Sequence, residues 1–201
     1  KAPTDEEISE IEKELGYKLP QSYIELIKKH NGGIPVLRVF LTDDYEINIT
    51  GIFGIDRTKR HSLCGELGSA FMISEWGYPN IGIAVADTIS GGHDMIFLDY
   101  RECGKDGEPK VVVVDQESDY HIGVLADTFE DFIKGLTIDA TEMENEDFAL
   151  LDESQKCLAI KFLQEMQEEE RVIELLNYVG IENLSAELMG MLARSYNNNN
   201  Q

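Results

Sequence analysis

The sequence is poor in basic residues. Its 201 residues include 17 lysines and arginines against 39 aspartates and glutamates, which gives a formal net charge of −22. Binding to a nucleic-acid backbone requires clustered Lys and Arg, so the composition argues against direct binding of nucleic acid and of anionic membranes. A basic protein partner would suit this charge, because opposite fields accelerate encounter. The simpler alternative is that the charge only keeps the protein soluble.

Cysteine is also scarce. Cys64, Cys103 and Cys157 are far apart and odd in number, so they provide neither a disulfide framework nor the spacing of a metal site. We therefore expect a reducing environment and a cytoplasmic location. No stretch predicts a signal peptide or a membrane-spanning segment. A hydrophobic content of 42% is enough for one core, and the length predicts one domain, or a domain with an extension.

Signatures of cofactors and catalysis are missing as well. The four histidines show no HxH, HExxH or Cys/His spacing, so a zinc site is not expected. Asp43, Asp44 and Glu46 lack the glycine and the distal glutamate of a calcium-binding loop. The segment 65–68 lacks the Lys and Ser/Thr of a nucleotide loop. We expect no metal ion, no cofactor and no enzymatic activity.

One pair of residues leaves a catalytic alternative open. His93 and Asp94 follow Gly91 and Gly92, with Asp87 nearby in the chain, and a histidine beside a carboxylate can act as a general base. The other interpretation is a turn, in which glycine supplies positive φ and Asp or His bonds to local backbone amides. We prefer the turn, because no nucleophile or oxyanion-hole motif accompanies the pair.

The most informative stretch runs from Ile83 to Glu117. Two apolar runs, Met95–Leu98 and Val111–Val114, are separated by the turn-rich sequence GKDGEP, and this pattern predicts a tight β-meander. An aspartate, Asp99 or Asp115, follows each run.

Other elements follow from apolar periodicity and capping residues. Further strands are predicted over residues 34–40, 46–53 and 81–86. Helices are predicted between a Thr4–Glu7 capping box and Gly16, over 20–30, 62–74, 127–136 and 154–179, and after a Ser185 cap.

Six pieces in this order resemble the SUKH superfamily, named for a fungal cell-wall synthesis regulator and including many bacterial relatives. After the N-terminal helix come LPQSYIELIKKHNGG, GIFGID, ISEWGYPN with IGIAVADTISGGHDMIFLDY, GEPKVVVVDQE and LADTFEDFIKGL. The resemblance implies an α+β fold, a mostly antiparallel β-sheet packed with helices, which we expect to be followed by a helical C-terminal extension. The expected boundaries are a SUKH-like domain over 1–136, an acidic linker over 137–153, a helical extension over 154–196 and a disordered Asn-rich tail over 197–201.

The resemblance also implies a function. Many bacterial members are immunity proteins, or antitoxins, that bind and neutralise polymorphic toxins, often nucleases, and the family is not known for a shared catalytic activity. We therefore expect a non-enzymatic protein-binding module whose partner is a basic toxin domain. The alternative is an intracellular scaffold or regulator of cell-wall or stress signalling, which the long acidic extension and the Asn-rich end would suit. The sequence leaves the oligomeric state open.

The expected contacts with a protein partner are acidic and aromatic residues. We place Glu117 and Asp119 first, at the end of the meander away from Gly91–Gly92, ahead of Asp99, which could instead bond to backbone in a turn. The remaining candidates are Asp94, Tyr78 and Trp76. For Trp76 the alternatives are an exposed interface anchor and a plug at the edge of the core.

Overall fold

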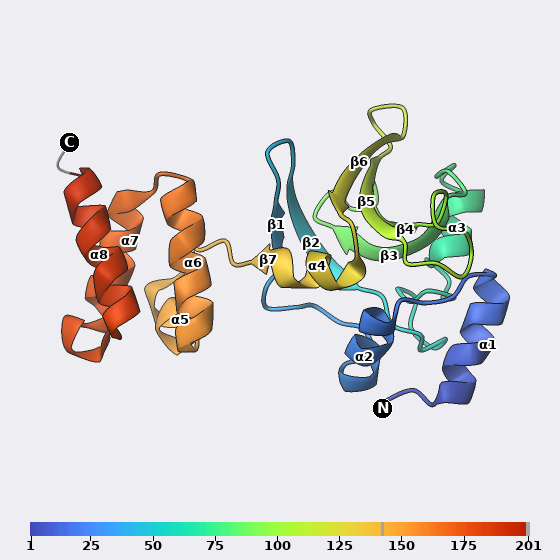
Figure 1. The fold of residues 1–201 in the computed structure, drawn as a ribbon, viewed down its shortest axis with the longest axis horizontal. Helices are drawn as coiled ribbons and strands as arrows, with labels where there is room; N and C mark the ends of the chain where they lie inside the picture. The colour runs from blue at the N-terminus through green and yellow to red at the C-terminus, as the bar shows by residue number, and fades with distance from the viewer. Residues whose placement is uncertain (142, 200–201) are drawn as a thin grey trace. The chain divides into compact units, whose positions relative to one another are not determined.

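The fold is α+β, as the sequence predicts: a curled sheet with helices, followed by further helices (Figure 1). It is taken from a computed structural model that describes residues 1–141 and 143–199. The chain divides into two compact units, residues 1–136 and residues 137–201. In the part of the chain that the structure describes, no helix combines the length and apolar character needed to cross a membrane.

The first unit is built on a seven-stranded sheet in the order β6-β5-β4-β3-β2-β1-β7. The strands are β1 (Val39–Leu41), β2 (Glu46–Ile52), β3 (Gly82–Thr88), β4 (Asp94–Asp99), β5 (Lys110–Asp115), β6 (His121–Ala126) and β7 (Leu136–Thr137). Each neighbouring pair from β1 to β6 is antiparallel. Consecutive strands are therefore neighbours, which is the predicted meander.

Four helices accompany the sheet: α1 (Asp5–Leu15), α2 (Gln21–Lys29), α3 (Ser69–Ser74) and α4 (Phe129–Gly135). The predicted capping box at the start of α1 is confirmed, since Thr4 and Glu7 bond to each other's backbone N–H groups. The end of α1 is also confirmed, because Gly16 has φ 76°, in the left-handed region that glycine enters without strain.

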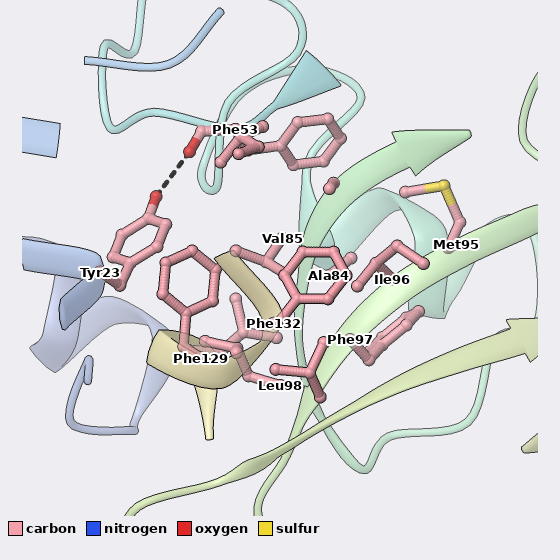
Figure 2. Packing of buried hydrophobic residues seen from close by; sticks show 14 of the residues in the cluster. Tyr23, Phe53, Ala84, Val85, Met95, Ile96, Phe97, Leu98, Phe129 and Phe132 are labelled. Carbon is pink, nitrogen blue, oxygen red and sulfur yellow. Dashed lines mark hydrogen bonds between the residues drawn. The ribbon is translucent and has the colours of Figure 1, made fainter. Parts of the chain in front are cut away.

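The core of this unit lies between the sheet and the helices α2 and α4 (Figure 2). The middle strands β3, β4 and β5 are buried along almost their whole length. Phe129 and Phe132 of α4 pack into this core, and the ring of Tyr23 on α2 meets Phe129 edge-on at 5.3 Å. The Tyr23 hydroxyl donates a hydrogen bond of 2.6 Å to the carbonyl oxygen of Phe53 (Figure 2).

Two sequence predictions for this unit are wrong in extent, and one strand is missed. The strand predicted over 34–40 is reduced to β1, because Pro35 has no N–H to give to a ladder. The helix predicted over 62–74 is reduced to α3; a Cβ on Gly65 or Gly68 would collide with backbone atoms, so the chain before α3 is tightly turned. Strand β6 is missed because Gly123 interrupts its short apolar run.

The second unit is helical and has its own buried residues. It consists of α5 (Asn145–Leu150), α6 (Glu153–Glu165), α7 (Glu169–Val179), a short 3-10 helix (Ile181–Asn183) and α8 (Ala186–Asn199). Helix α7 contacts α5, α6 and α8, and Leu175 and Leu176 on it are fully buried. The predicted cap of the last helix is confirmed by the hydrogen bond from Leu188 N to Ser185 Oγ.

One long helix over 154–179 is a wrong prediction. The chain breaks between α6 and α7, where Gln167 has φ 62°. The acidic run Glu168–Glu170 therefore lies at the beginning of α7 and not along a helix face. Negative charge is favourable there, because the first N–H groups of a helix carry partial positive charge.

The segments predicted as a linker and a tail are also more ordered than expected. Residues 137–153 include helix α5, whose Phe148 is fully buried. Arg171 of α7 donates hydrogen bonds to the carbonyl oxygens of Ala140 and Met143, which fastens the segment before α5. Residues 197–199 belong to α8, and residues 200–201 of the predicted tail lie outside the described residues.

The buried tyrosine of Figure 2 yields a stability prediction. Tyr23→Phe removes the donor to a buried carbonyl and leaves that oxygen without its partner, so the free energy of unfolding should fall by about 1 to 2 kcal/mol. Urea denaturation measures it. The control is Tyr17→Phe, which removes a hydroxyl from a half-buried ring. Equal effects of the two substitutions would contradict the role of the Tyr23 hydrogen bond.

Candidate functional site

The register of β4 and β5 decides which acidic residues come together. Asp94 is paired with Asp115 at one end of the two strands, and Asp99 is paired with Lys110 at the other end. Six residues of strand separate the two ends by about 17 Å. Asp94 and Asp115 therefore lie side by side, while Asp99 lies far from both.

The turn after β5 is shaped by Asp115. Its Oδ1 accepts hydrogen bonds from the backbone N–H of Glu117 at 2.9 Å and of Ser118 at 3.1 Å, and the Ser118 hydroxyl bonds to its other oxygen. The hydrogen bonds from Ser118 hold the pKa of Asp115 below its usual value. This aspartate fixes the turn that presents Glu117, which is exposed.

The tip of the same turn presents Asp119. His121 N donates to Ser118 O at 3.1 Å, and the two residues between them, Asp119 and Tyr120, have φ of 55° and 56°. Two positive φ values are the pattern of a type I′ hairpin turn. A tyrosine in this region is strained, and its hydroxyl is anchored by donating to Trp76 O at 2.6 Å. Asp119 is left exposed at the tip.

Trp76 joins this turn to the turn before β4. Its ring packs so closely on Gly92 that a Cβ there would lie 2.9 Å from it, and it meets the His93 ring edge-on at 6.1 Å. The Gln116 side-chain amide donates to Trp76 O at 3.2 Å. The indole is half-buried, so it both closes the edge of the core and keeps part of its surface accessible.

Asp94, Asp115, Glu117 and Asp119, which we name the acidic edge, concentrate negative charge. Burial raises the pKa of Asp94, and the charges of Asp115 and Glu117 raise it further. The His93 ring lies close to this cluster, with its Nδ1 3.5 Å from Glu117 Oε1. The histidine of the catalytic alternative thus faces a glutamate of the neighbouring turn and not its sequence neighbour Asp94.

Two of the six sequence-predicted contact residues are buried. Tyr78 is 2% exposed, stacks on Phe97 at 5.5 Å and donates from its hydroxyl to Gly92 O at 2.5 Å, so it belongs to the core. Asp99 is 7% exposed, and Arg101 binds both of its carboxylate oxygens. Burial opposes ionisation of Asp99, but the hydrogen bonds and charge of Arg101 outweigh it and leave the pKa lowered. Neither side chain presents a surface to a partner.

The remaining four come together, but not where the sequence predicts. Trp76, Asp94, Glu117 and Asp119 gather at the end of the sheet that carries Gly91 and Gly92, whereas the acidic residues were expected at the opposite end. The reason is that β4 begins at Asp94 and the antiparallel strand β5 ends at Asp115, so these two residues lie at the same end of the sheet.

Sequence reasoning counted Asp115 among the acidic residues at the strand ends, but missed how Asp115, Gln116 and Tyr120 hold this site together. Asp115, Gln116 and Tyr120 set the turn and tie it to Trp76. The spacing of Asp115 and Ser118 is the one available signal, because an aspartate that precedes a serine by three residues can form such a turn. Nothing in the sequence reveals the two bonds to the Trp76 carbonyl, which join residues 40 and 44 positions apart.

Comparison with known proteins adds an independent observation. The model of the SMI1 / KNR4 family (SUKH-1) matches residues 2–135, two thirds of the chain. The chain belongs to the SUKH-1 family. Curated proteins and solved structures contain no significant match.

Membership in SUKH-1 is consistent with a protein-binding immunity module, and the family is generally non-catalytic, with immunity and regulatory roles. The match ends at Gly135, so it does not extend to the helices α5 to α8. Over residues 1–141 and 143–199, no group of three or more His, Cys, Asp or Glu side chains is placed to hold a metal ion.

Repulsion within the acidic edge of this SUKH-1 domain should lower its free energy of unfolding. Asp94→Asn removes one of two like charges directly opposite each other on β4 and β5, so it should raise the free energy of unfolding by about 0.2 to 1 kcal/mol at pH 7. Because the pKa of Asp94 is raised, the gain should disappear as the pH falls through that pKa and the wild-type carboxyl becomes neutral. Urea denaturation at several pH values measures it. Asp43→Asn, at an exposed turn, is the control, and a loss of stability in Asp94→Asn would contradict the repulsion.

Asp99 should show the opposite pH dependence. Its lowered pKa means that its stabilising contribution is complete above the ordinary aspartate pKa of about 4 and is lost as the pH falls through the lower folded value. Arg101→Gln should cost about 1 to 2 kcal/mol at pH 7, since the arginine is half exposed but binds a buried carboxylate. The difference from wild type should shrink below about pH 4. If the difference in the free energy of unfolding between wild type and Arg101→Gln stays constant from pH 7 to pH 3, the pairing of Arg101 with Asp99 does not have this role.

Proposed function

We propose that this SUKH-1 protein is an immunity protein that binds a basic polymorphic toxin, a nuclease domain, through the acidic edge and Trp76. The observation that supports this most directly is the β4–β5 register, which places Asp94 and Asp115 side by side, with Glu117 and Asp119 on the adjoining turn. Trp76 is half-buried, and its ring meets His93, which lies 3.5 Å from Glu117; tryptophan is among the residues that dominate protein interfaces.

The mechanism is steric and electrostatic. A nuclease lines its substrate groove with Lys and Arg to hold phosphates, and the acidic edge offers carboxylates to those same side chains. Complementary charge mainly raises the association rate, while truncating one partner of a desolvated pair costs about 2 to 5 kcal/mol or more. The protein would block the toxin by covering its groove, with no bond made or broken.

Charge reversal on the turn tests the proposal. Glu117→Lys combined with Asp119→Lys should lower the association rate with a toxin domain encoded beside this gene by about tenfold or more at low salt. Surface plasmon resonance at two salt concentrations measures it, and the wild-type rate should fall as salt screens the field.

The matched control is Glu6→Lys with Glu10→Lys on α1, two exposed residues that produce the same change in net charge. The control should change the association rate much less than the turn variant. If both pairs slow association equally, net charge and not the acidic edge is responsible. Absence of any binding at low salt would refute the immunity function itself.

A second candidate function is an intracellular scaffold or regulator of cell-wall or stress signalling. It is supported by the second unit, which lies outside the family match and has a buried core of its own on α5 to α8. A regulator could use such a unit for a further partner. A toxin gene next to this one favours the immunity function, and a gene without such a neighbour favours this second candidate.

A further inference from the structure

A pocket of about 340 Å³ opens beside the acidic edge. Its lining is mainly apolar, with one carboxylate, and includes His61, Trp76, Asp87, Ile89, Gly92 and Met95. Ile89 at its rim is 70% exposed, whereas Met95 is fully buried. The pocket therefore extends from the surface to the sheet.

The carboxylate of Asp87 is only partly used by the protein. Its Oδ2 lies 2.9 Å from His61 Nδ1, but its Oδ1 is buried and has no hydrogen-bond partner among the described residues. Burial raises the pKa of Asp87, and the charge and hydrogen bond of His61 act against that rise. A buried carboxylate oxygen without a donor is unfavourable, so a donor that reaches this oxygen when the His61 ring moves aside is favoured.

The indole of Trp76 forms another wall of the pocket. It can approach the backbone this closely because residue 92 is glycine, with φ 107°, where a Cβ would come within 2.9 Å of the ring. An aromatic face and a carboxylate in one largely apolar pocket are the two groups that a guanidinium prefers: it stacks on the first and bonds to the second through its planar fork.

We infer that this pocket receives an arginine side chain of the partner protein, with its guanidinium between Trp76 and Asp87. This rests on the proposed binding of a basic protein and specifies one residue of that partner. Arginine fits better than lysine, because a compact ammonium neither stacks on an indole as a plane nor bonds to both carboxylate oxygens at once.

In the unbound protein His61 occupies the place of the cation. Its side chain is 56% exposed, while that of Asp87 is 21% exposed, so the imidazole covers the carboxylate from the solvent side. An entering guanidinium displaces this ring and takes over its hydrogen bond. Asp87 and His61 therefore have opposite roles: the first attracts the arginine and the second competes with it.

The test needs no toxin, because Trp76 is the only tryptophan of the chain and lines this pocket, so its fluorescence responds to binding there. Titration of the full chain with N-acetyl-arginine amide should change the fluorescence saturably, with a Kd on the order of millimolar for one contact. N-acetyl-citrulline amide, which has the same shape without charge, and N-acetyl-lysine amide should bind at least fivefold more weakly. An equal response to either compound overturns the inference.

Variants assign the response to the two side chains. Asp87→Asn should weaken arginine amide at least fivefold, whereas His61→Ala, which removes the competing ring, should strengthen its binding. A purely structural role for the pair predicts equal loss in both variants, and that result overturns the inference.

A rim variant keeps the test valid if Asp87→Asn does not fold. Ile89→Arg places a competing guanidinium at the exposed mouth and should weaken binding at least fivefold, while Ile34→Arg, at an isoleucine that is 75% exposed elsewhere, should not. If the Ile89→Arg variant binds N-acetyl-arginine amide as tightly as wild type does, the inference is overturned. The toxin-binding proposal is tested separately, by the association rates of the acidic-edge variants, so its failure can be told apart from failure of the arginine pocket.

Discussion

The antiparallel pairing of β4 with β5 is the constraint on which the rest of this protein depends. Val111 to Val114 lie opposite Met95 to Leu98, and both runs are buried. A shift of one residue would turn every apolar side chain of a strand to the other face of the sheet. The hydrophobic core therefore fixes the register, and the register in turn sets Asp94 beside Asp115. Acidic side chains are brought together by the burial of valines and not by any attraction of their own.

This arrangement explains how a cluster of like charges persists. The repulsion between facing carboxylates is worth at most about 1 kcal/mol, whereas burying one large aliphatic side chain contributes roughly 1.5 to 3 kcal/mol. The strand pair contains eight buried apolar residues in the two runs, so the acidic edge is a small cost against a large gain. By contrast, Asp99 at the other end of β4 is neutralised by Arg101. At one end of β4 the carboxylate of Asp99 is thus held by an arginine, whereas at the other end the carboxylate of Asp94 faces another carboxylate.

The elements that the sequence predicts correctly are those that depend on residues close together in the chain. The capping box of α1, the cap of α8 and the apolar runs of β4 and β5 each depend on residues within a few positions, and all are present in the structure. The failures are of another kind. Tyr78 reads as a surface aromatic because its burial depends on stacking with Phe97, and the break at Gln167 has no glycine or proline to announce it. The grouping of Glu117 with Trp76 depends on bonds between residues about 40 positions apart.

Trp76 links the two parts of the proposed interface. Its carbonyl holds the turn that presents Glu117 and Asp119, and its ring lines the pocket that contains Asp87. Exposed charges act at a distance and mainly change how fast partners meet, whereas a desolvated contact mainly changes how slowly they separate. In the proposed interface, one indole would thus join a surface for rapid encounter to a pocket for long residence. An inhibitor of a toxin needs both properties, because it has to reach the toxin before the substrate does and then remain bound.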